Sequence, residues 1–535
     1  MAIFLNPDNA NFNEAVHSKI YVDKTGLIEY TNSVLSTTAK FICNSRPRRF
    51  GKSMTADMLC AYYSKGCESR ELFQPYTISS CSTFEKYINQ YDVIHIDVQW
   101  CKDQVENIND IVNYIKESCM HELQNEYSNI DYNGIISLSG TLSKINDETG
   151  HRFVVIIDEW DVLIRDNANN KKLLEEYIDF LKGLFKGSQP SRYIALAYLT
   201  GILPIKRTMT QSALNNFDEY TMLNPGPLAS FIGFTEGEVK GLSNKYNIDF
   251  DRIKKWYDGY HFGDFDVYCP WDVMNYLLEL QRNSNAKPIS YWKNTSDNAI
   301  IRSFIDYAGS TITNKLETLM AGGCIVQRVD ENLTYNYLHS SEDNLWSMLY
   351  LTGYLTKARE EDYKGELPDD MVALMIPNAE IKEIFETTVI KWFDDSTKKW
   401  NRNALFDAVW NGDSEGITRE MNALLRRTIS YHDYREDFYH AFLAGIFTGA
   451  GYMVDSNKEH GEGRSDVVIY DSMNARVAIF EAKYTKVLEN LGSACDTALR
   501  QIDDRMYAKE YEEDYDQILC YGISFFKKRC MVKKK

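Results

Sequence analysis

The chain has 535 residues, of which 44% are hydrophobic, 25% are charged and 13% are aromatic, and its formal net charge is -18. This composition predicts a globular protein with several hydrophobic cores and excludes an extensively disordered chain. The acidic balance disfavours a protein coated in nucleic acid, although local basic patches stay compatible with binding.

The eleven cysteines lie scattered, without C-x-x-C pairs or neighbouring histidines. This pattern disfavours a zinc site or a disulfide framework and favours reduced, buried thiols in a cytoplasmic protein. The amino-terminal residues lack the pattern of a signal peptide, and no apolar run approaches the roughly 18 residues of a membrane span. We therefore expect no membrane segment.

Four apolar runs alternate with helical patterns across roughly the first 205 residues, at 39–45, 91–100, 152–161 and 192–203. Continuous apolar runs are typical of strands that are buried on both faces, and the helices between them indicate βαβ crossovers. The pattern predicts an α/β domain with a parallel sheet.

The rest of the chain predicts two further regions. From about 230 to 400 it indicates mainly helices, and the last third indicates an αβββαβ arrangement whose final strand is at 517–526. We therefore expect domains at 1–230, 231–400 and 401–535. The lysine-rich tail FFKKRCMVKKK is expected to be a solvated, frayed terminus.

The first apolar run precedes a segment, RPRRFGKS (46–53), that nearly matches a phosphate-binding loop. Gly51, Lys52 and Ser53 fit the pattern G-x-x-x-x-G-K-[ST], whereas Arg46 stands where the first glycine belongs. In such a loop the backbone N–H groups face phosphates, the lysine reaches the β- and γ-phosphates, and the hydroxyl binds Mg²⁺. The strand–loop–helix context that the motif requires is present, because a helical pattern follows the loop.

Two further strand ends carry polar residues of the right kind for ATP hydrolysis. In FVVIIDEWD, Asp158 and Glu159 leave an apolar strand, and Thr200 ends the strand in LAYLTG. We expect Asp158 to hold Mg²⁺, Glu159 to polarise the attacking water and Thr200 to sense the γ-phosphate. The alternative for the acidic pair is a strand terminus that faces solvent. Three parts in this order, each at a strand end, favour an ATPase over coincidence.

Five segments, YVDKT, RPRRFGKS, IIDEWD, LTGILPI and WYDGYHFG, together resemble the AAA-ATPase-like family, P-loop proteins that often carry a C-terminal nuclease-like domain. The resemblance spans roughly residues 20–265. It implies that arginine in place of the first glycine is a family variant of the loop. It also adds Arg46, Arg48 and Arg49 as candidate phosphate contacts, with the alternative that these arginines face elsewhere.

For other residues of these segments, the sequence allows two interpretations. Asp23 and Lys24 either border the base pocket or form a surface turn, and Arg207 is either a cis arginine finger or a surface arginine. The aromatic residues around Tyr260 and His261 either close over a nucleotide or a nucleic-acid strand, or fill the joint between sheet and helices. Packing is the favoured interpretation for the aromatic residues.

The family resemblance directs attention to the PD-(D/E)xK nuclease pattern. A literal match joins Asp369 to Glu380 and Lys382. The surrounding residues have helical periodicity, so Glu380 and Lys382 would lie on different faces of a helix, and we reject this match.

A better candidate for the nuclease motif lacks the proline of the PD-(D/E)xK pattern. Asp466 begins one strand, and Glu481 and Lys483 end the next, where residues two apart share a face. We expect Asp466 and Glu481, with Glu436 from the preceding helix, to bind Mg²⁺. Lys483 would orient or activate the water that attacks a phosphodiester. The alternative is an exposed hairpin with an ordinary Glu–Lys pair.

These features predict an ATP-dependent switch whose nucleotide state controls a metal-dependent nuclease. By analogy with other proteins of this architecture, the expected role is in intracellular defence or in mobile-element processing. One alternative is a signalling or scaffold NTPase with a nuclease-like domain that binds without cutting, and another is an ATPase that remodels a protein partner. The expected ligands are ATP, Mg²⁺ and nucleic acid of undetermined type, and an oligomer is compatible with the sequence.

Overall fold

A computed structural model describes residues 2–205, 214–262, 265–292, 315–316, 318–330, 342–397, 403–428, 436–448, 452–456, 459–460, 463–464, 467–485, 487–526 and 529–535. The chain forms two compact units. The first contains Met1–Tyr291 and Val326–Glu380, and the second contains Trp292–Ile325 and Ile381–Lys535. The expected domain boundaries at residues 230 and 400 stay predictions.

A five-stranded parallel sheet forms the centre of the first unit, in the order β2-β3-β4-β1-β5. The strands are β1 (Phe41–Ser45), β2 (Asp92–Asp97), β3 (Phe153–Asp158), β4 (Ile194–Gly201) and β5 (Asp218–Tyr220). The first, third and fourth are buried at every position, as continuous apolar runs predict. The parallel α/β fold is therefore confirmed. Strand β5 was not expected, because its sequence DEY gives no apolar signal.

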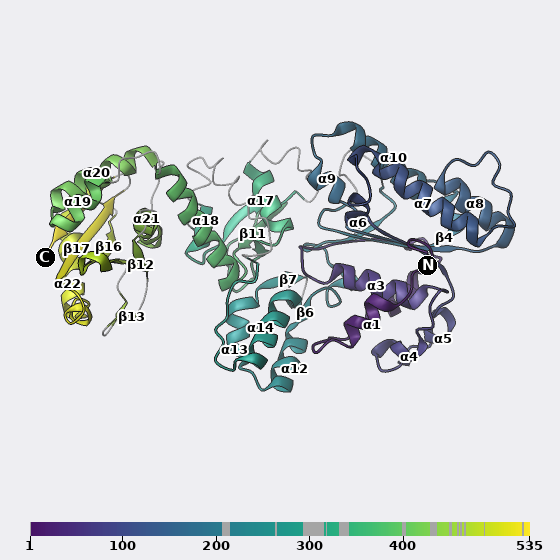
Figure 1. Ribbon diagram of the computed structural model, residues 1–535, viewed down its shortest axis with the longest axis horizontal. Helices are drawn as coiled ribbons and strands as arrows, with labels where there is room; N and C mark the ends of the chain where they lie inside the picture. Colours follow the sequence, from purple (N-terminus) through teal and green to yellow (C-terminus); the bar gives the residue numbers. More distant parts are fainter. Residues whose placement is uncertain are drawn as a thin grey trace. The chain divides into compact units, whose positions relative to one another are not determined.

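Helices cover both faces of this sheet (Figure 1). On one face lie α1 (Ala10–Val16) and α3 (Lys52–Tyr63), and on the other lie α7 (Ile111–Glu126), α8 (Leu138–Thr149) and α10 (Lys171–Phe185). Apolar residues of α3 and of the strands form one core, which includes Leu59, Val154 and Leu196. Because all five strands are parallel, their carboxyl ends meet at one edge of the sheet.

The region after the sheet combines helices with short strands. Its helices are α12 (Glu236–Tyr246), α13 (Phe250–Tyr257), α14 (Pro270–Arg282) and α17 (Glu342–Leu351), in agreement with the helical prediction. Two small three-stranded sheets were not expected. One has the order β6 (Phe234–Thr235), β8 (Phe265–Tyr268), β7 (Tyr260–Phe262). The other has the order β10 (Thr356–Lys357), β11 (Met371–Met375), β9 (Ile325–Arg328). Such short strands carry too little periodicity to be predicted.

The second unit has a five-stranded mixed sheet, in the order β12-β15-β16-β17-β18. The strands are β12 (Met453–Ser456), β15 (Val467–Asp471), β16 (Arg476–Tyr484), β17 (Gln517–Phe526) and β18 (Arg529–Lys534). The helices are α18 (Ala379–Thr397), α19 (Asn403–Asn411), α20 (Ser414–Thr428), α21 (Glu436–Thr448) and α22 (Leu491–Asp504). The run from α21 to β17 matches the expected αβββαβ arrangement.

The expectation of a frayed C-terminal tail is wrong. Residues Arg529–Lys534 form β18, which pairs antiparallel with β17. Cys530 and Val532 are buried, and they alternate with Arg529, Met531 and Lys533, which are exposed or partly exposed. The lysines of the tail hide this two-residue alternation, which is typical of an edge strand.

Among the helices within the described ranges, none is long and apolar enough to cross a membrane. All eleven cysteines carry free thiols, in agreement with the sequence.

Candidate ATP site and nuclease-like site

The phosphate-binding loop joins β1 to α3. Gly51 precedes the helix with a φ of 90°, in the left-handed region that favours glycine. A Cβ on Gly51 would meet no atom within 4 Å, so conformation rather than crowding calls for glycine here. Ser53, in the first turn of α3, is exposed. The loop therefore has the open outer side that an approaching phosphate needs.

Lys52 lies at the centre of the charged edge of the sheet. Its side chain is 4% exposed, and its Nζ donates to the carbonyl oxygen of Pro47 at 2.9 Å. Burial lowers the pKa of Lys52, whereas the charges of Glu159, Asp158 and Asp161 act to raise it. A buried ammonium group within reach of open space is suited to an anionic ligand.

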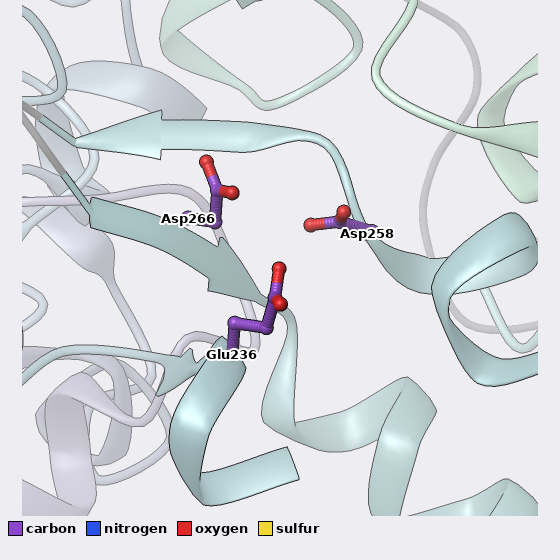
Figure 2. Close-up of side chains that lie close together, drawn as sticks. All are labelled: Glu236, Asp258 and Asp266. Atoms are coloured by element: carbon purple, nitrogen blue, oxygen red, sulfur yellow. The ribbon is translucent and has the colours of Figure 1, made fainter. Parts of the chain in front are cut away.

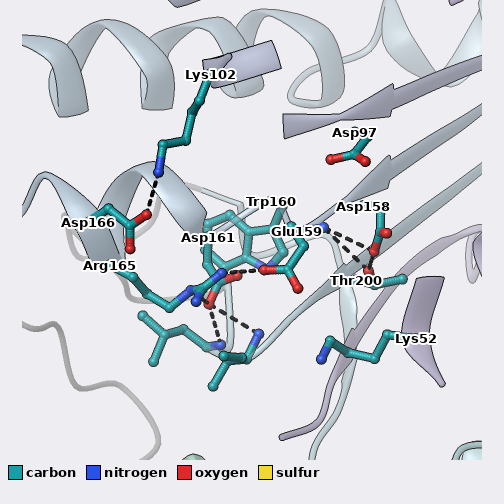
Figure 3. Close-up of polar contacts among 12 residues, drawn as sticks. Lys52, Asp97, Lys102, Asp158, Glu159, Trp160, Asp161, Arg165, Asp166 and Thr200 are labelled. Atoms are coloured by element: carbon teal, nitrogen blue, oxygen red, sulfur yellow. Dashed lines mark hydrogen bonds and ion pairs between the residues drawn. The ribbon is translucent and has the colours of Figure 1, made fainter. Parts of the chain in front are cut away.

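Asp158 and Thr200 lie directly against each other. Strand β4 lies between β1 and β3, and the hydroxyl of Thr200 donates to Oδ1 of Asp158. Both side chains are buried. Figure 3 shows Lys52, Asp158 and Thr200 at the same edge of the sheet. Three of the residues predicted from the sequence are thus brought together by the strand order.

Glu159 follows Asp158 in a tight turn. Its φ is 52°, and its backbone N–H faces Oδ1 of Asp158 at 3.1 Å. Its side chain is 24% exposed and forms an ion pair with Arg165. Figure 3 shows the carboxylate of Glu159 between Arg165 and Lys52. The predicted water-polarising residue therefore lies beside the predicted phosphate-binding lysine.

Sequence reasoning missed three residues of this edge: Asp97, Asp161 and Arg165. Asp97 ends β2 in register with Asp158, and burial and then the charge of Asp158 raise the pKa of Asp97. Asp161 and Arg165 form an ion pair with 3.1 Å between Oδ2 and Nε. The spacing of four residues between opposite charges in DEWDVLIRD was the available signal.

The arginines of the loop make contacts within the protein. Arg46 is buried and donates from Nη1 to the carbonyl oxygens of Ser45 at 2.8 Å and Tyr220 at 2.7 Å. Its guanidinium lies 4.8 Å from the ring centre of Phe262, and that of Arg49 lies 5.8 Å from the ring centre of Trp271. These contacts favour a structural role. Their contact with phosphate stays a prediction, and Arg207 lies outside the described residues.

The aromatic segment after α13 is packed inside the first unit. The hydroxyl of Tyr257 donates to the carbonyl oxygen of Ile289 at 3.0 Å, and that of Tyr260 donates to Gly353 at 2.8 Å. Both rings are buried, which supports the packing interpretation.

An acidic cluster lies next to this segment, formed by Glu236, Asp258 and Asp266 (Figure 2). Within the described residues it is the one group whose carboxylate oxygens, all within 4.8 Å of one another, have a spacing that admits a metal ion. Lys240, Lys254 and Arg359 surround it and form ion pairs with its members. The Nδ1 of His261 lies 2.8 Å from Asp266, and burial and the charge of Arg359 lower the pKa of this histidine. The cluster is therefore an ion-pair network whose charge is already compensated.

The nuclease-like site is described in part. Glu481 and Lys483 lie on one face of β16, with 3.1 Å between Lys483 Nζ and Glu481 Oε1. Glu481 is 0% exposed and Lys483 is 21% exposed. Asp466 lies outside the described residues. Glu436 begins α21, but its side chain also lies outside the described part of the chain.

The rejected PD-ExK match does lie on a helix. Glu380 and Lys382 are in the first turn of α18. Glu380 is buried, whereas Lys382 is exposed and reaches Glu386 at 4.0 Å. The prediction that these two residues face different ways is confirmed.

The order of the parallel sheet and the glycine loop between β1 and α3 are those of a P-loop NTPase fold, which is followed by a nuclease-like mixed sheet. Comparison with known families agrees. Residues 10–210 match the family described as "Predicted AAA-ATPase", and residues 434–535 match the "PD-(D/E)XK nuclease superfamily". Both resemblances expected from the sequence are confirmed, and the chain combines an ATPase-like region with a nuclease-like region.

Similarity to one curated protein runs along nearly the whole chain. The "Uncharacterized protein in vnfD 5'region" of Azotobacter chroococcum mcd 1 is 23% identical over 522 residues, covering 94% of this chain and 92% of that protein.

Similarity to solved structures is weak. AMPPCP-bound DnaA from Aquifex aeolicus has a TM-score of 0.25 and 8% identity, covering 58% of this chain and 77% of that chain. The Aeropyrum pernix ORC2 protein, in ADPNP-ADP complexes, has a TM-score of 0.32 and 11% identity, covering 74% of this chain and 100% of that chain. TM-scores this low have no bearing on the site.

Proposed function

We propose that this protein is an ATP-hydrolysing switch whose nucleotide state controls a metal-dependent nuclease that acts on nucleic acid. The observation that carries the ATPase half is the convergence of Lys52, Asp158, Glu159 and Thr200 at the carboxyl edge of one parallel sheet.

The residues at this edge fit ATP and Mg²⁺. The left-handed glycine leaves open space beside the loop, and Lys52 supplies a positive charge there. Asp158 and the hydroxyl of Ser53 would hold Mg²⁺, which neutralises charge on the phosphates when it is bound. Glu159 orients and polarises a water, and Thr200 fixes the Asp158 carboxylate by a hydrogen bond.

The nuclease half rests on Glu481 and Lys483, which share a strand face at the end of β16. A carboxylate and a lysine on one strand face, together with a second carboxylate, suit metal-assisted hydrolysis of a phosphodiester. Glu481 would hold the metal together with Asp466, and Lys483 would orient the attacking water. Glu436 is proposed as a third acidic residue.

Control of one activity by the other requires a mechanical connection, and the first unit offers one. Phe50, in the phosphate-binding loop, has its ring centre 4.9 Å from that of Tyr260 and 5.6 Å from that of Phe262. Tyr260 and Phe262 belong to β7, and the backbone of Gly259, just before this strand, touches Pro377. Helix α18 starts two residues after Pro377 and continues from the first unit into the second.

The ATPase half is tested with Lys52→Ala and Glu159→Gln. We expect Lys52→Ala to weaken ATP binding by about 10- to 100-fold, because a charge-assisted hydrogen bond contributes about 1.5–3 kcal/mol. We expect Glu159→Gln to keep ATP affinity and to slow hydrolysis by about 10²- to 10⁴-fold. Titration calorimetry and phosphate release measure the two effects. Unchanged affinity in Lys52→Ala would refute the assignment of the loop.

The nuclease half is tested with Lys483→Ala, and Lys382→Ala is its matched control in the rejected motif. We expect Lys483→Ala to abolish Mg²⁺-dependent cleavage of DNA or RNA while ATP hydrolysis continues. Lys382→Ala should cleave at the wild-type rate, because its partly exposed pair with Glu386 contributes little. Cleavage is measured on single- and double-stranded substrates, with and without Mg²⁺. If the wild-type protein binds nucleic acid and never cuts it, the scaffold alternative is correct.

A further inference from the structure

The segment DEWDVLIRD holds a buried ion-pair chain behind the ATP site. Arg165 contacts Oε2 of Glu159 through Nη2, and its Nε lies 3.1 Å from Oδ2 of Asp161. The side chain of Arg165 is 3% exposed, and Asp161 is fully buried. One guanidinium group therefore bridges the proposed water-polarising carboxylate and a carboxylate in the protein interior.

Asp161 is itself anchored to the neighbouring strand. Its Oδ2 accepts the backbone N–H groups of Ile202 at 3.1 Å and Leu203 at 2.9 Å, which directly follow β4. Burial raises the pKa of Asp161, and the charge of Arg165 is the largest opposing influence. Without the guanidinium, this carboxylate would be a buried charge with backbone partners alone.

The backbone of the turn is fixed to the same place. The N–H of Trp160 donates to the carbonyl oxygen of Thr200 at 2.9 Å, and Tyr177 donates from its hydroxyl to the carbonyl oxygen of Trp160 at 2.7 Å. The turn that carries Glu159 is thus held to the strand end that carries Thr200 by a backbone hydrogen bond. Glu159 keeps one rotatable part, its side chain, and Arg165 restrains that part.

We infer that Arg165, anchored by Asp161, is a positioning residue that holds the Glu159 carboxylate in place for ATP hydrolysis. This inference rests on the proposed ATPase function. Arg165 contacts one oxygen of the Glu159 carboxylate, and the other oxygen points towards Lys52 (Figure 3). A planar, forked guanidinium can bridge two carboxylates in fixed geometry, and a lysine ammonium cannot.

The test compares Arg165→Ala and Arg165→Lys with the wild-type protein. We expect Arg165→Ala to lower kcat for ATP hydrolysis by about 10- to 100-fold with little change in ATP affinity, because small misplacements of a reacting group have effects of this size. Arg165→Lys keeps a charge next to Asp161 and so protects folding, yet loses the fork. Its kcat should lie between those of Arg165→Ala and the wild type, and thermal unfolding checks that each variant is folded.

A double-mutant cycle separates positioning from a general structural role. If Arg165 acts through Glu159, adding Arg165→Lys to Glu159→Gln should change kcat by less than about twofold. The matched control is Asp166→Asn, which breaks the neighbouring ion pair of Asp166 with Lys102 and should keep the wild-type kcat.

The outcomes are distinct. If the wild-type protein hydrolyses no ATP, the proposed function fails and this inference fails with it. If the wild type is active and Arg165→Lys matches it in kcat, the inference alone is overturned. If Arg165→Lys loses ATP affinity at unchanged kcat, or if its effect adds fully to that of Glu159→Gln, Arg165 acts on the nucleotide or on the fold and the inference is also overturned.

Discussion

Asp23 shows how a residue of a recognisable motif can act by joining segments of the fold. Its carboxylate accepts four hydrogen bonds, from the backbone N–H and the hydroxyl of Thr25 at 2.8 and 2.7 Å, and from those of Thr77 at 2.8 and 2.6 Å. The next residue, Lys24, pairs with Glu238 at the start of α12. The segment YVDKT therefore ties the amino-terminal part of the chain to two distant segments.

These contacts predict a pH dependence of stability. Burial acts to raise the pKa of Asp23, but the hydrogen bonds from Thr77 and Thr25 outweigh it and hold this pKa below its usual range. A carboxyl group whose pKa is lower in the folded state than in the unfolded state stabilises the fold above its unfolded-state pKa, about 4. This stabilisation is lost as the pH falls through the folded-state pKa. Asp23→Asn should therefore cost about 1–3 kcal/mol at pH 7 and progressively less towards pH 3.

Urea unfolding of wild type and Asp23→Asn between pH 7 and pH 3 measures this difference. Asp103→Asn, at an exposed aspartate, serves as the control and should leave the free energy of unfolding unchanged. A difference between Asp23→Asn and wild type that stays constant across the pH range would contradict the hydrogen-bond explanation.

At the scale of elements, the sequence predicts those parts whose pattern is local. Strands β1 to β4 were found because each is a continuous apolar run, and the parallel order then brought Lys52, Asp158 and Thr200 to one edge. The polar strand β5 and the lysine-rich strand β18 were missed because their pairing depends on a neighbouring strand rather than on their own composition.

The candidate site divides in the same way. Residues at strand ends were predicted, since a parallel sheet fixes where strand ends lie. Arg165 was not, because its contact with Glu159 depends on a turn with positive φ that no periodicity encodes. Asp161 was missed with it, because its role depends on its ion pair with Arg165. The burial of Arg46 was missed for a related reason: its partners are backbone carbonyls of Ser45 and Tyr220, and Tyr220 is far away in sequence.

At the scale of the whole molecule, α18 is the element that both units share. It begins at Ala379, next to the last residue of the first unit, and most of its length belongs to the second. Its first turn carries Glu380, whose buried carboxylate, after burial itself, helps to raise the pKa of Asp272 on α14. The start of α18 is therefore fixed inside the first unit, so a shift of that packing has a covalent route to the second unit. A route of this kind requires evidence of coupling, because spatial connection alone does not establish it.

Gly259→Ala supplies that evidence. Gly259 has a φ of 117°, and a Cβ at this position would lie 1.8 Å from the carbonyl oxygen of Pro377, so the substitution must separate β7 from the residues before α18. The residues proposed to hydrolyse ATP are untouched. We expect ATP hydrolysis to continue, whereas the ratio of nuclease rates with and without ATP should fall towards one. Gly241→Ala is the control, because it adds a methyl group to α12 in open space and should keep the wild-type ratio. Both activities are measured on the same preparations, with thermal unfolding as a check on folding. A wild-type ratio in a folded Gly259→Ala protein would exclude this route and leave the two activities uncoupled or coupled elsewhere.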